Sequence, residues 1–202
     1  MSPVRAKNGA VFVRIAAGHG NGIITIAAAI NPAMIFTIGD KVVHPQHGVG
    51  QIVKLEDKEF ESGVIRQYYE ISMLGGSTVW APVDLSTVGL RKPAKRSDIA
   101  QCRRILTSAS APLPEDLRTR QSSLLARLKQ GTIVTFCEVV RDLYAYGEHK
   151  SLYGTIAGFF RVTKDVLAQE WSLVEGVTLL DAMEEINSLL AKGREAMNAK
   201  KR

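Results

Sequence analysis

Residues 36–52 read FTIGDKVVHPQHGVGQI, and they indicate a β structure for the first half of the chain. Valine and isoleucine recur in this stretch between turn-forming glycine, proline and histidine residues, a pattern typical of short strands joined by tight turns. Runs of valine, isoleucine and tyrosine continue the pattern to residue 91. Residues 40–91 are therefore predicted to form short antiparallel strands.

Two turns and one strand end can be placed within this β region. Residues 61–63 predict one hairpin turn, and Gly75-Gly76 predicts a tighter one, because glycine adopts positive φ at both central positions without steric cost. Pro82 has no backbone N–H and cannot donate to a strand ladder, so the strand that contains Trp80 must end there or lie at an edge.

From residue 97 onwards the apolar residues recur at helical spacing. Helices are predicted over residues 97–106, 114–130, 132–144, 152–171 and 178–196, with Ser97 and Thr132 as N-caps of the first and third. The basic, proline-broken segment 91–96 separates the two patterns and predicts a domain boundary. The fold class is therefore α+β, a small N-terminal β domain (34–93) followed by an all-α helical bundle (97–196).

The two ends of the chain differ from these domains. Residues 1–33 contain scattered glycines and an apolar stretch that is too short to span a bilayer, and they are predicted to be a disordered extension. A signal peptide is the alternative interpretation. Because Met34 leads directly into the β region, translation could also begin there. Residues 197–202 are predicted to be a basic tail.

Composition favours a polyanionic partner without identifying it. The chain has 202 residues, which suffices for one domain or two small ones, and a formal net charge of +6. Its two cysteines, Cys102 and Cys137, lack metal-ligand spacing and lie in apolar helical patterns. They are predicted to be buried free thiols in a reducing cytoplasm.

No sequence pattern of a catalytic or cofactor site emerges. His44 and His47 have no third ligand nearby, so they are interpreted as turn histidines with no bound metal. Gly48-Val49-Gly50 lacks the strand-to-helix context of a phosphate-binding loop. The sequence therefore predicts a protein that is not an enzyme and has no cofactor, and an enzyme with an unfamiliar site is the alternative.

Residues 138–144 read EVVRDLY, and with residues 36–52, in this order and spacing, they resemble the CarD family of bacterial RNA-polymerase-binding transcription regulators. The resemblance implies a Tudor-like or SH3-like small β-barrel that binds the β subunit of RNA polymerase. It also implies a helical domain that contacts promoter DNA near the upstream edge of the transcription bubble and stabilises the open complex. A cytoplasmic monomer is expected.

The resemblance implies a polymerase-binding site on the β domain. Lys58 and Trp80 align with positions at which members of the family hold arginines that contact polymerase, so the second position has lost a charge. Pro82 lies beside Trp80 at the predicted edge, where a partner strand can add main-chain hydrogen bonds.

The resemblance also implies that the helix over residues 114–130 contacts DNA. Leu117 occupies the position of a tryptophan that wedges into the minor groove in relatives, and leucine offers a smaller surface and no indole N–H. The basic candidates for phosphate contacts are Arg118, Arg120, Arg127 and Lys129. Two alternatives stay open: Leu117 belongs to an apolar core stripe, or the chain is a polymerase-bound adaptor with little DNA contact.

Overall fold

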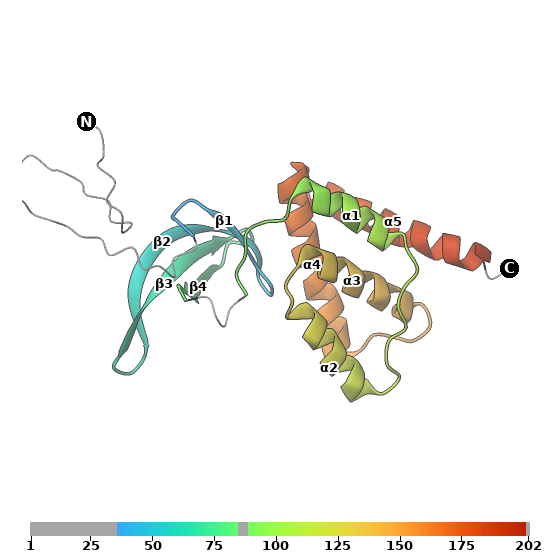
Figure 1. The fold of residues 1–202 in the computed structure, drawn as a ribbon, viewed down its shortest axis with the longest axis horizontal. Helices are drawn as coiled ribbons and strands as arrows, with labels where there is room; N and C mark the ends of the chain where they lie inside the picture. Colours follow the sequence, from blue (N-terminus) through green and yellow to red (C-terminus); the bar gives the residue numbers. More distant parts are fainter. Residues whose placement is uncertain (1–35, 85–88, 201–202) are drawn as a thin grey trace, which may run out of the picture. The chain divides into compact units, whose positions relative to one another are not determined.

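The computed structural model describes residues 36–84 and 89–200, and in them an antiparallel sheet precedes a set of α-helices (Figure 1). Within these ranges the sheet has four strands and five helices follow it. This is the predicted α+β class. The proposed extension at residues 1–33 and the end of the proposed basic tail lie outside the described residues.

The strands lie in the sheet in the order in which they follow one another along the chain. They are β1 (Lys41–His44), β2 (Gly48–Glu61), β3 (Val64–Met73) and β4 (Thr78–Pro82), and each pairs antiparallel with its neighbours. Successive side chains of a strand point to opposite faces. Tyr69 and Ile71 are accordingly buried on one face, whereas Tyr68, Glu70 and Trp80 lie on the other.

Both predicted hairpin turns are present. Gly63, at φ 77°, follows β2, and Gly76, at φ 82°, lies between β3 and β4. Both residues have left-handed backbone conformations, which residues other than glycine rarely adopt. Gly75 does not have a positive φ, so the second turn is not the predicted one with two left-handed residues.

The prediction of a closed barrel is wrong. β1 and β4 are the two outer strands of the sheet, and the described residues contain no pairing between them. Among the described residues beyond β4, Arg91 alone pairs with β1, through a single antiparallel bridge to Val43. Four strands are few for a closed barrel, and Pro82 cannot extend the ladder of β4 with an N–H of its own.

The helices begin and end within a few residues of the predicted positions. They are α1 (Arg96–Leu106), α2 (Leu117–Leu128), α3 (Ile133–Gly147), α4 (Gly154–Glu175) and α5 (Leu179–Lys200). Thr132 caps α3 as predicted, its side chain accepting from the N–H of Thr135. The prediction of Ser97 as a cap is wrong, because Lys95 is the N-cap of α1 and its N–H donates to Asp98.

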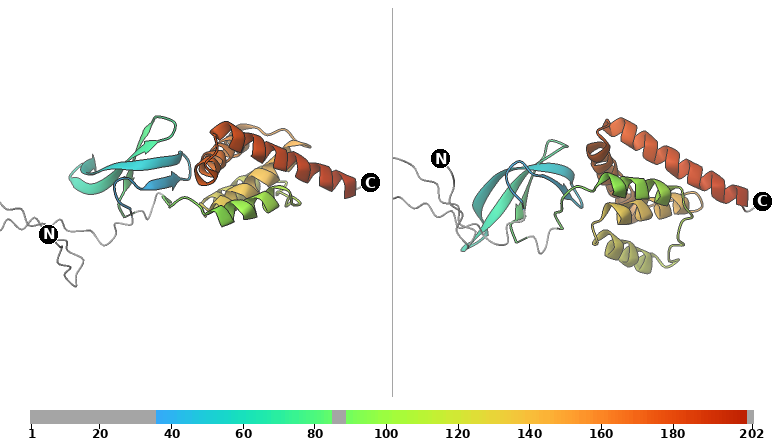
Figure 2. Two further views of the ribbon diagram at one scale, coloured as in Figure 1. Left: turned by 90° about the horizontal axis from the view of Figure 1, so that it is seen from above. Right: turned by 45° about the horizontal axis from the view of Figure 1, so that its top comes forward.

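The helices share an apolar core that includes both cysteines. Cys102 and Cys137 are fully buried beside Leu167 and Trp171, and both are free thiols, as predicted. Burial raises the pKa of the Cys137 thiol, which makes it a poor nucleophile. Gly193 lets α5 approach α1 closely, since a Cβ at that position would lie 2.8 Å from the carbonyl oxygen of Leu106. Figure 2 shows α1 in green and α5 in red in two further views. No helix in the described ranges is long and apolar enough to cross a membrane.

Candidate functional site

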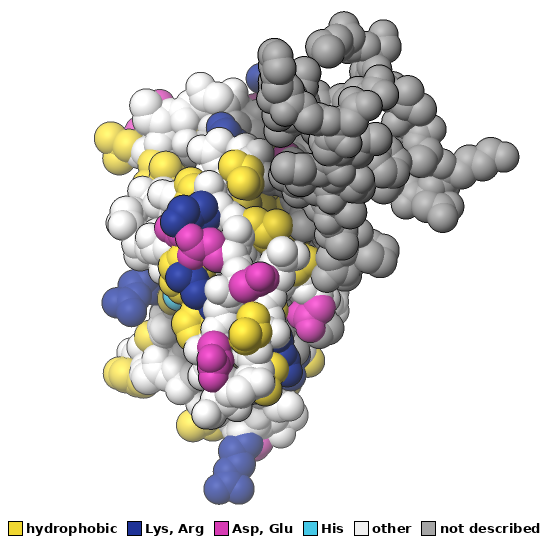
Figure 3. Space-filling model, turned by 90° about the vertical axis from the view of Figure 1, so that its left-hand side faces the viewer, with side chains coloured by type: hydrophobic (Ala, Val, Ile, Leu, Met, Phe, Trp, Pro, Cys, Tyr) yellow, Lys and Arg dark blue, Asp and Glu magenta, His cyan; other side chains and the backbone are white. Residues whose placement is uncertain are grey.

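Two of the residues predicted to bind polymerase are in direct contact. The ammonium nitrogen of Lys58, on β2, lies 4.3 Å from the ring centroid of Trp80, on β4. This is a cation–π contact, which holds the two side chains together across β3. Figure 3 shows basic, acidic and hydrophobic side chains intermixed on one face of the molecule.

Lys58 also has an acidic neighbour. Its ammonium lies 2.8 Å from a carboxylate oxygen of Glu56, and Lys54 pairs with the other oxygen of that carboxylate. The hydrogen bonds from Lys54 and then Lys58 lower the pKa of Glu56 to about 2. Glu56 is therefore ionised at neutral pH, and it orients Lys58 while reducing the net charge that the surface presents.

Pro82 completes this surface at the outer strand. It pairs with Tyr68 in the sheet, and the ring of Tyr68 meets Phe60 edge to face, with centroids 4.8 Å apart. Phe60 is 58 % exposed. We call the set Lys58, Phe60, Tyr68, Trp80 and Pro82 the outer sheet face. Phe60 and Tyr68 are not among the residues predicted to bind polymerase, although Phe60 follows Lys58 at the two-residue spacing of one strand face.

On the helical side, Leu117 is exposed rather than part of the core. It is the first residue of α2 and 51 % exposed, whereas Leu124 of the same helix is fully buried. The helix begins here because Asp116 caps it, accepting from the N–H and hydroxyl of Thr119 at 2.8 and 2.7 Å. The cap turns Leu117 outward together with the exposed Arg118.

Arg120 faces inward on the same helix. It is 7 % exposed, and one guanidinium nitrogen donates to the carbonyl oxygens of Pro114 and Glu115 at 2.7 and 2.9 Å. The guanidinium also lies 4.8 Å from the ring centroid of Tyr146. The charge of Arg120 is thus engaged in closing the segment that leads into α2.

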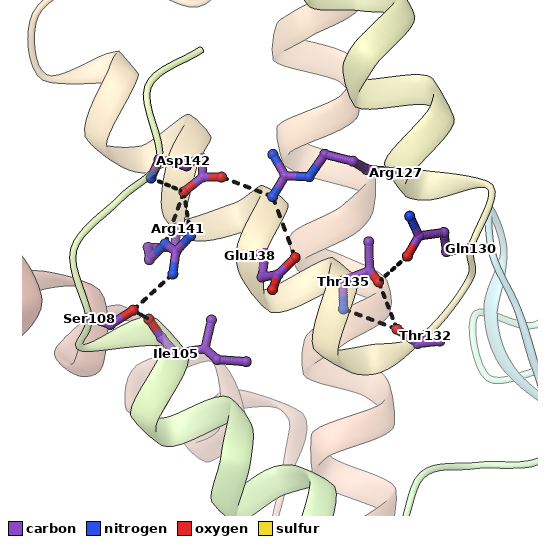
Figure 4. A network of polar contacts seen from close by, with 10 residues as sticks. Ile105, Ser108, Arg127, Gln130, Thr132, Thr135, Glu138, Arg141 and Asp142 are labelled. Carbon is purple, nitrogen blue, oxygen red and sulfur yellow. Dashed lines mark hydrogen bonds and ion pairs between the residues drawn. The ribbon is translucent and has the colours of Figure 1, made fainter.

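Arg127 is engaged in a network around Asp142 (Figure 4). Asp142 is 1 % exposed, accepts from Arg127 at 2.9 Å, and accepts from Arg141 and from the N–H of Ala111, also at 2.9 Å. Arg141 donates onward to Ser108. Arg141 and Asp142 of the EVVRDLY motif (residues 138–144) therefore connect α2, α3 and the segment after α1. Among the basic residues predicted on α2, Arg118 and Lys129 are the two that are exposed.

A buried ion pair connects the segment after the sheet to α4. Arg91 makes a two-pronged pair with Glu170, including a 2.7 Å contact, and exchanges backbone hydrogen bonds with Val43 of β1. Glu170 is fully buried and also accepts from the N–H of Ala94 at 2.8 Å. The neighbouring Gln169 accepts from the N–H of Val49 at 3.0 Å.

The histidine turn has no metal-like geometry. Nδ1 of His44 accepts from the N–H groups of Gln46 and His47, at 3.2 and 3.3 Å, so it closes the turn after β1. Burial, and secondarily the charge of His47, lowers the pKa of His44 to about 4. Within the described residues no cluster of three histidine, cysteine or carboxylate side chains is placed to hold a metal ion.

Comparison with known proteins identifies both parts of the chain. The model of the CarD-like/TRCF RID domain matches residues 36–93, and the model of the CarD C-terminal domain matches residues 101–187. The chain belongs to the CarD family. It is also similar to a Bacillus subtilis (strain 168) protein described as "Putative transcription factor YdeB", with 29 % identity over 150 residues that cover 71 % of this chain and 95 % of the relative.

As a member of the CarD family, the chain carries the candidate residues at two separate places. The outer sheet face lies within the region matched by the CarD-like/TRCF RID model, and Leu117 with Arg118 lies within the region matched by the C-terminal model. The contacts of Arg120 with Tyr146 and of Arg127 with Asp142 could not be anticipated from the sequence, because both partners lie on another helix.

Proposed function

We propose that the chain is a non-enzymatic transcription regulator that binds RNA polymerase through its sheet and promoter DNA through its helices. The observation that carries this proposal is the match of both halves of the chain to models of the CarD family. The description of its Bacillus relative as a transcription factor supports the same function. The domain bounds 34–93 and 97–196, a cytoplasmic location and a monomeric state belong to the proposal.

The outer sheet face supports the polymerase part of the proposal. It combines a positioned lysine with exposed and half-exposed aromatic rings, and aromatic residues are enriched at protein interfaces. β4 is an outer strand of the sheet in the described residues, and an outer strand can pair with a strand of the polymerase β subunit.

The exposure of Leu117 supports the DNA part. An apolar side chain at the start of a helix, beside Arg118, suits insertion at an opened base step while the arginine contacts a phosphate. The mechanism is a population shift: binding the open complex more tightly than the closed one favours opening by that difference in affinity. A coupling of about 1–3 kcal/mol is the usual scale.

The test combines binding with promoter kinetics. The full chain should bind the isolated β lobe in a titration, and it should lengthen the lifetime of the open complex on a ribosomal-type promoter. No binding to polymerase would overturn the proposal as a whole.

A second candidate function is a polymerase-bound adaptor whose helices contact another protein. The observation that favours it is the engagement of Arg120 and Arg127 inside the helical domain, which leaves α2 with fewer free cations than its sequence suggests. Polymerase binding with an unchanged open-complex lifetime, and promoter binding that is weak and insensitive to salt, would support the adaptor.

A further inference from the structure

Tyr153 is a highly exposed aromatic side chain at the start of α4. It is 77 % exposed, the largest exposed fraction among the large hydrophobic side chains of the described residues. It is also the N-cap of α4, where its side chain makes no capping hydrogen bond. Serine, threonine, aspartate or asparagine would satisfy that helix end better. A residue type that is unfavourable at a helix N-cap and is also exposed is a candidate for function.

The segments that carry Tyr153 and Leu117 share neighbours within the helical domain. Leu113, four residues before Leu117, and Leu152, the neighbour of Tyr153, pack against one apolar cluster that contains Ile156. A second link runs through Tyr146, whose ring is flanked by Arg120 of α2 at 4.8 Å and by Lys150 at 5.9 Å. The start of α2 and the segment before α4 therefore share two sets of neighbours.

The charges around Tyr153 suit a nucleic-acid strand. Arg118 and Lys150 are exposed cations on the two segments. The acidic residues there, Glu115, Asp116 and Glu148, are also exposed, but Asp116 accepts from Thr119 and Glu148 pairs with Arg194 at 3.2 Å. Cations for phosphates beside a free aromatic ring for bases are the two elements with which proteins bind single strands.

We propose that Tyr153 stacks on an unpaired base at the edge of opened promoter DNA and acts beside Leu117. The proposal rests on the proposed function and adds a contact to it. In this arrangement Tyr153 supplies the aromatic surface that leucine lacks at position 117, and Lys150 supplies a nearby cation for the same strand.

The test uses the full chain with RNA polymerase on a promoter that carries 2-aminopurine at the upstream edge of the bubble. Tyr153→Ala should shorten the open-complex lifetime about tenfold and reduce quenching of the probe, whereas Tyr153→Phe should retain both. Leu180→Ala, at a side chain that is 67 % exposed at the start of α5, is the matched control and should change neither. Thermal melts should be the same for all variants.

The possible failures are distinguishable. If the wild-type chain lengthens the lifetime and Tyr153→Ala does so equally, the role of Tyr153 is overturned and the proposed function stands. If Tyr153→Ala weakens binding to polymerase, the side chain contacts protein and the stacking role is overturned. If the wild-type chain has no effect on the lifetime, the DNA part of the proposed function fails and the role of Tyr153 fails with it.

Discussion

At the scale of single residues, the surroundings of a side chain decide what it can do more than its type does. Arg118 and Arg120 are two positions apart on α2, yet one is exposed and the other donates to two carbonyl oxygens. Leu117 and Leu124 differ in the same way. Variants at such pairs therefore separate an effect on binding from an effect on folding.

Leu117→Ala should shorten the open-complex lifetime and change the free energy of unfolding by less than about 0.5 kcal/mol, because the side chain is half exposed. Leu117→Trp should lengthen the lifetime through its larger stacking surface. The control is Leu124→Ala, which empties a fully buried site and should cost about 2–5 kcal/mol. Urea unfolding beside promoter kinetics makes the comparison, and a large loss of stability in Leu117→Ala would contradict it.

Lys58→Glu should weaken binding to the polymerase β lobe about fivefold, since it removes the cation–π contact with Trp80 and places a second carboxylate beside Glu56. Lys54→Glu is the matched control, because Lys54 also pairs with Glu56 and its charge is changed in the same way. Titration calorimetry with both variants tests this, and equal losses would assign the effect to overall charge.

The lowered pKa of His44 leads us to expect a loss of stability in mild acid. Its folded pKa of about 4 lies below the ordinary histidine value of 6.5, so the unfolded chain binds a proton first as the pH falls. Stability should therefore decline as the pH falls from 6.5 through 4. His44→Asn keeps an acceptor for the turn and removes the titration, so its melting temperature should depend less steeply on pH in this window. Parallel slopes for the two proteins would show that other groups are responsible.

At the scale of helices and strands, Asp142 should be the most sensitive position of the polar network. Asp142→Ala leaves Arg127 and Arg141 without their shared buried carboxylate and should cost about 3 kcal/mol of unfolding free energy. Ser108→Ala removes the outer hydrogen bonds of the network, from Arg141 and to the carbonyl oxygen of Ile105, and should cost about 1 kcal/mol or less. Urea titrations of both variants measure the difference, and similar costs would show that Asp142 is not the centre of the network.

Local patterns predicted the elements well and their ends less well. The apolar period and the Thr132 cap placed α3, because both act within a few residues. For α2, Pro114 suggested an earlier start, but the side chain of Asp116 bonds to Thr119 and shortens the helix. That shift makes Leu117 the first helical residue. Closure of the sheet and burial of Arg120 depend on contacts between distant segments, which no local pattern contains.

At the scale of the whole molecule, Glu170 should couple polymerase binding by the sheet to the effect of the helices on the open complex. Glu170→Gln keeps the shape of the side chain and removes the charge that Arg91 and the N–H of Ala94 share. Polymerase affinity should stay unchanged, because the outer sheet face is untouched, while the open-complex lifetime should shorten. Glu175→Gln is the control, since Glu175 pairs with Arg103 within the helical domain. Pull-down and promoter kinetics test the separation, and an unchanged lifetime would contradict it.

The contacts of α4 with the residues around β1 and β2 have a consequence for protein engineering. Gly48 has a φ of 81°, and a Cβ there would lie 2.0 Å from the side-chain oxygen of Gln169. Positions 48, 91, 169 and 170 therefore form a set that must be exchanged together. A chimaera that joins this sheet to the helices of a relative should fold well only if it keeps matched residues at these four positions and at the apolar positions that pack across the same contact, Val43, Val49, Phe136 and Val166, so a recombination partner can be chosen by comparing these positions first.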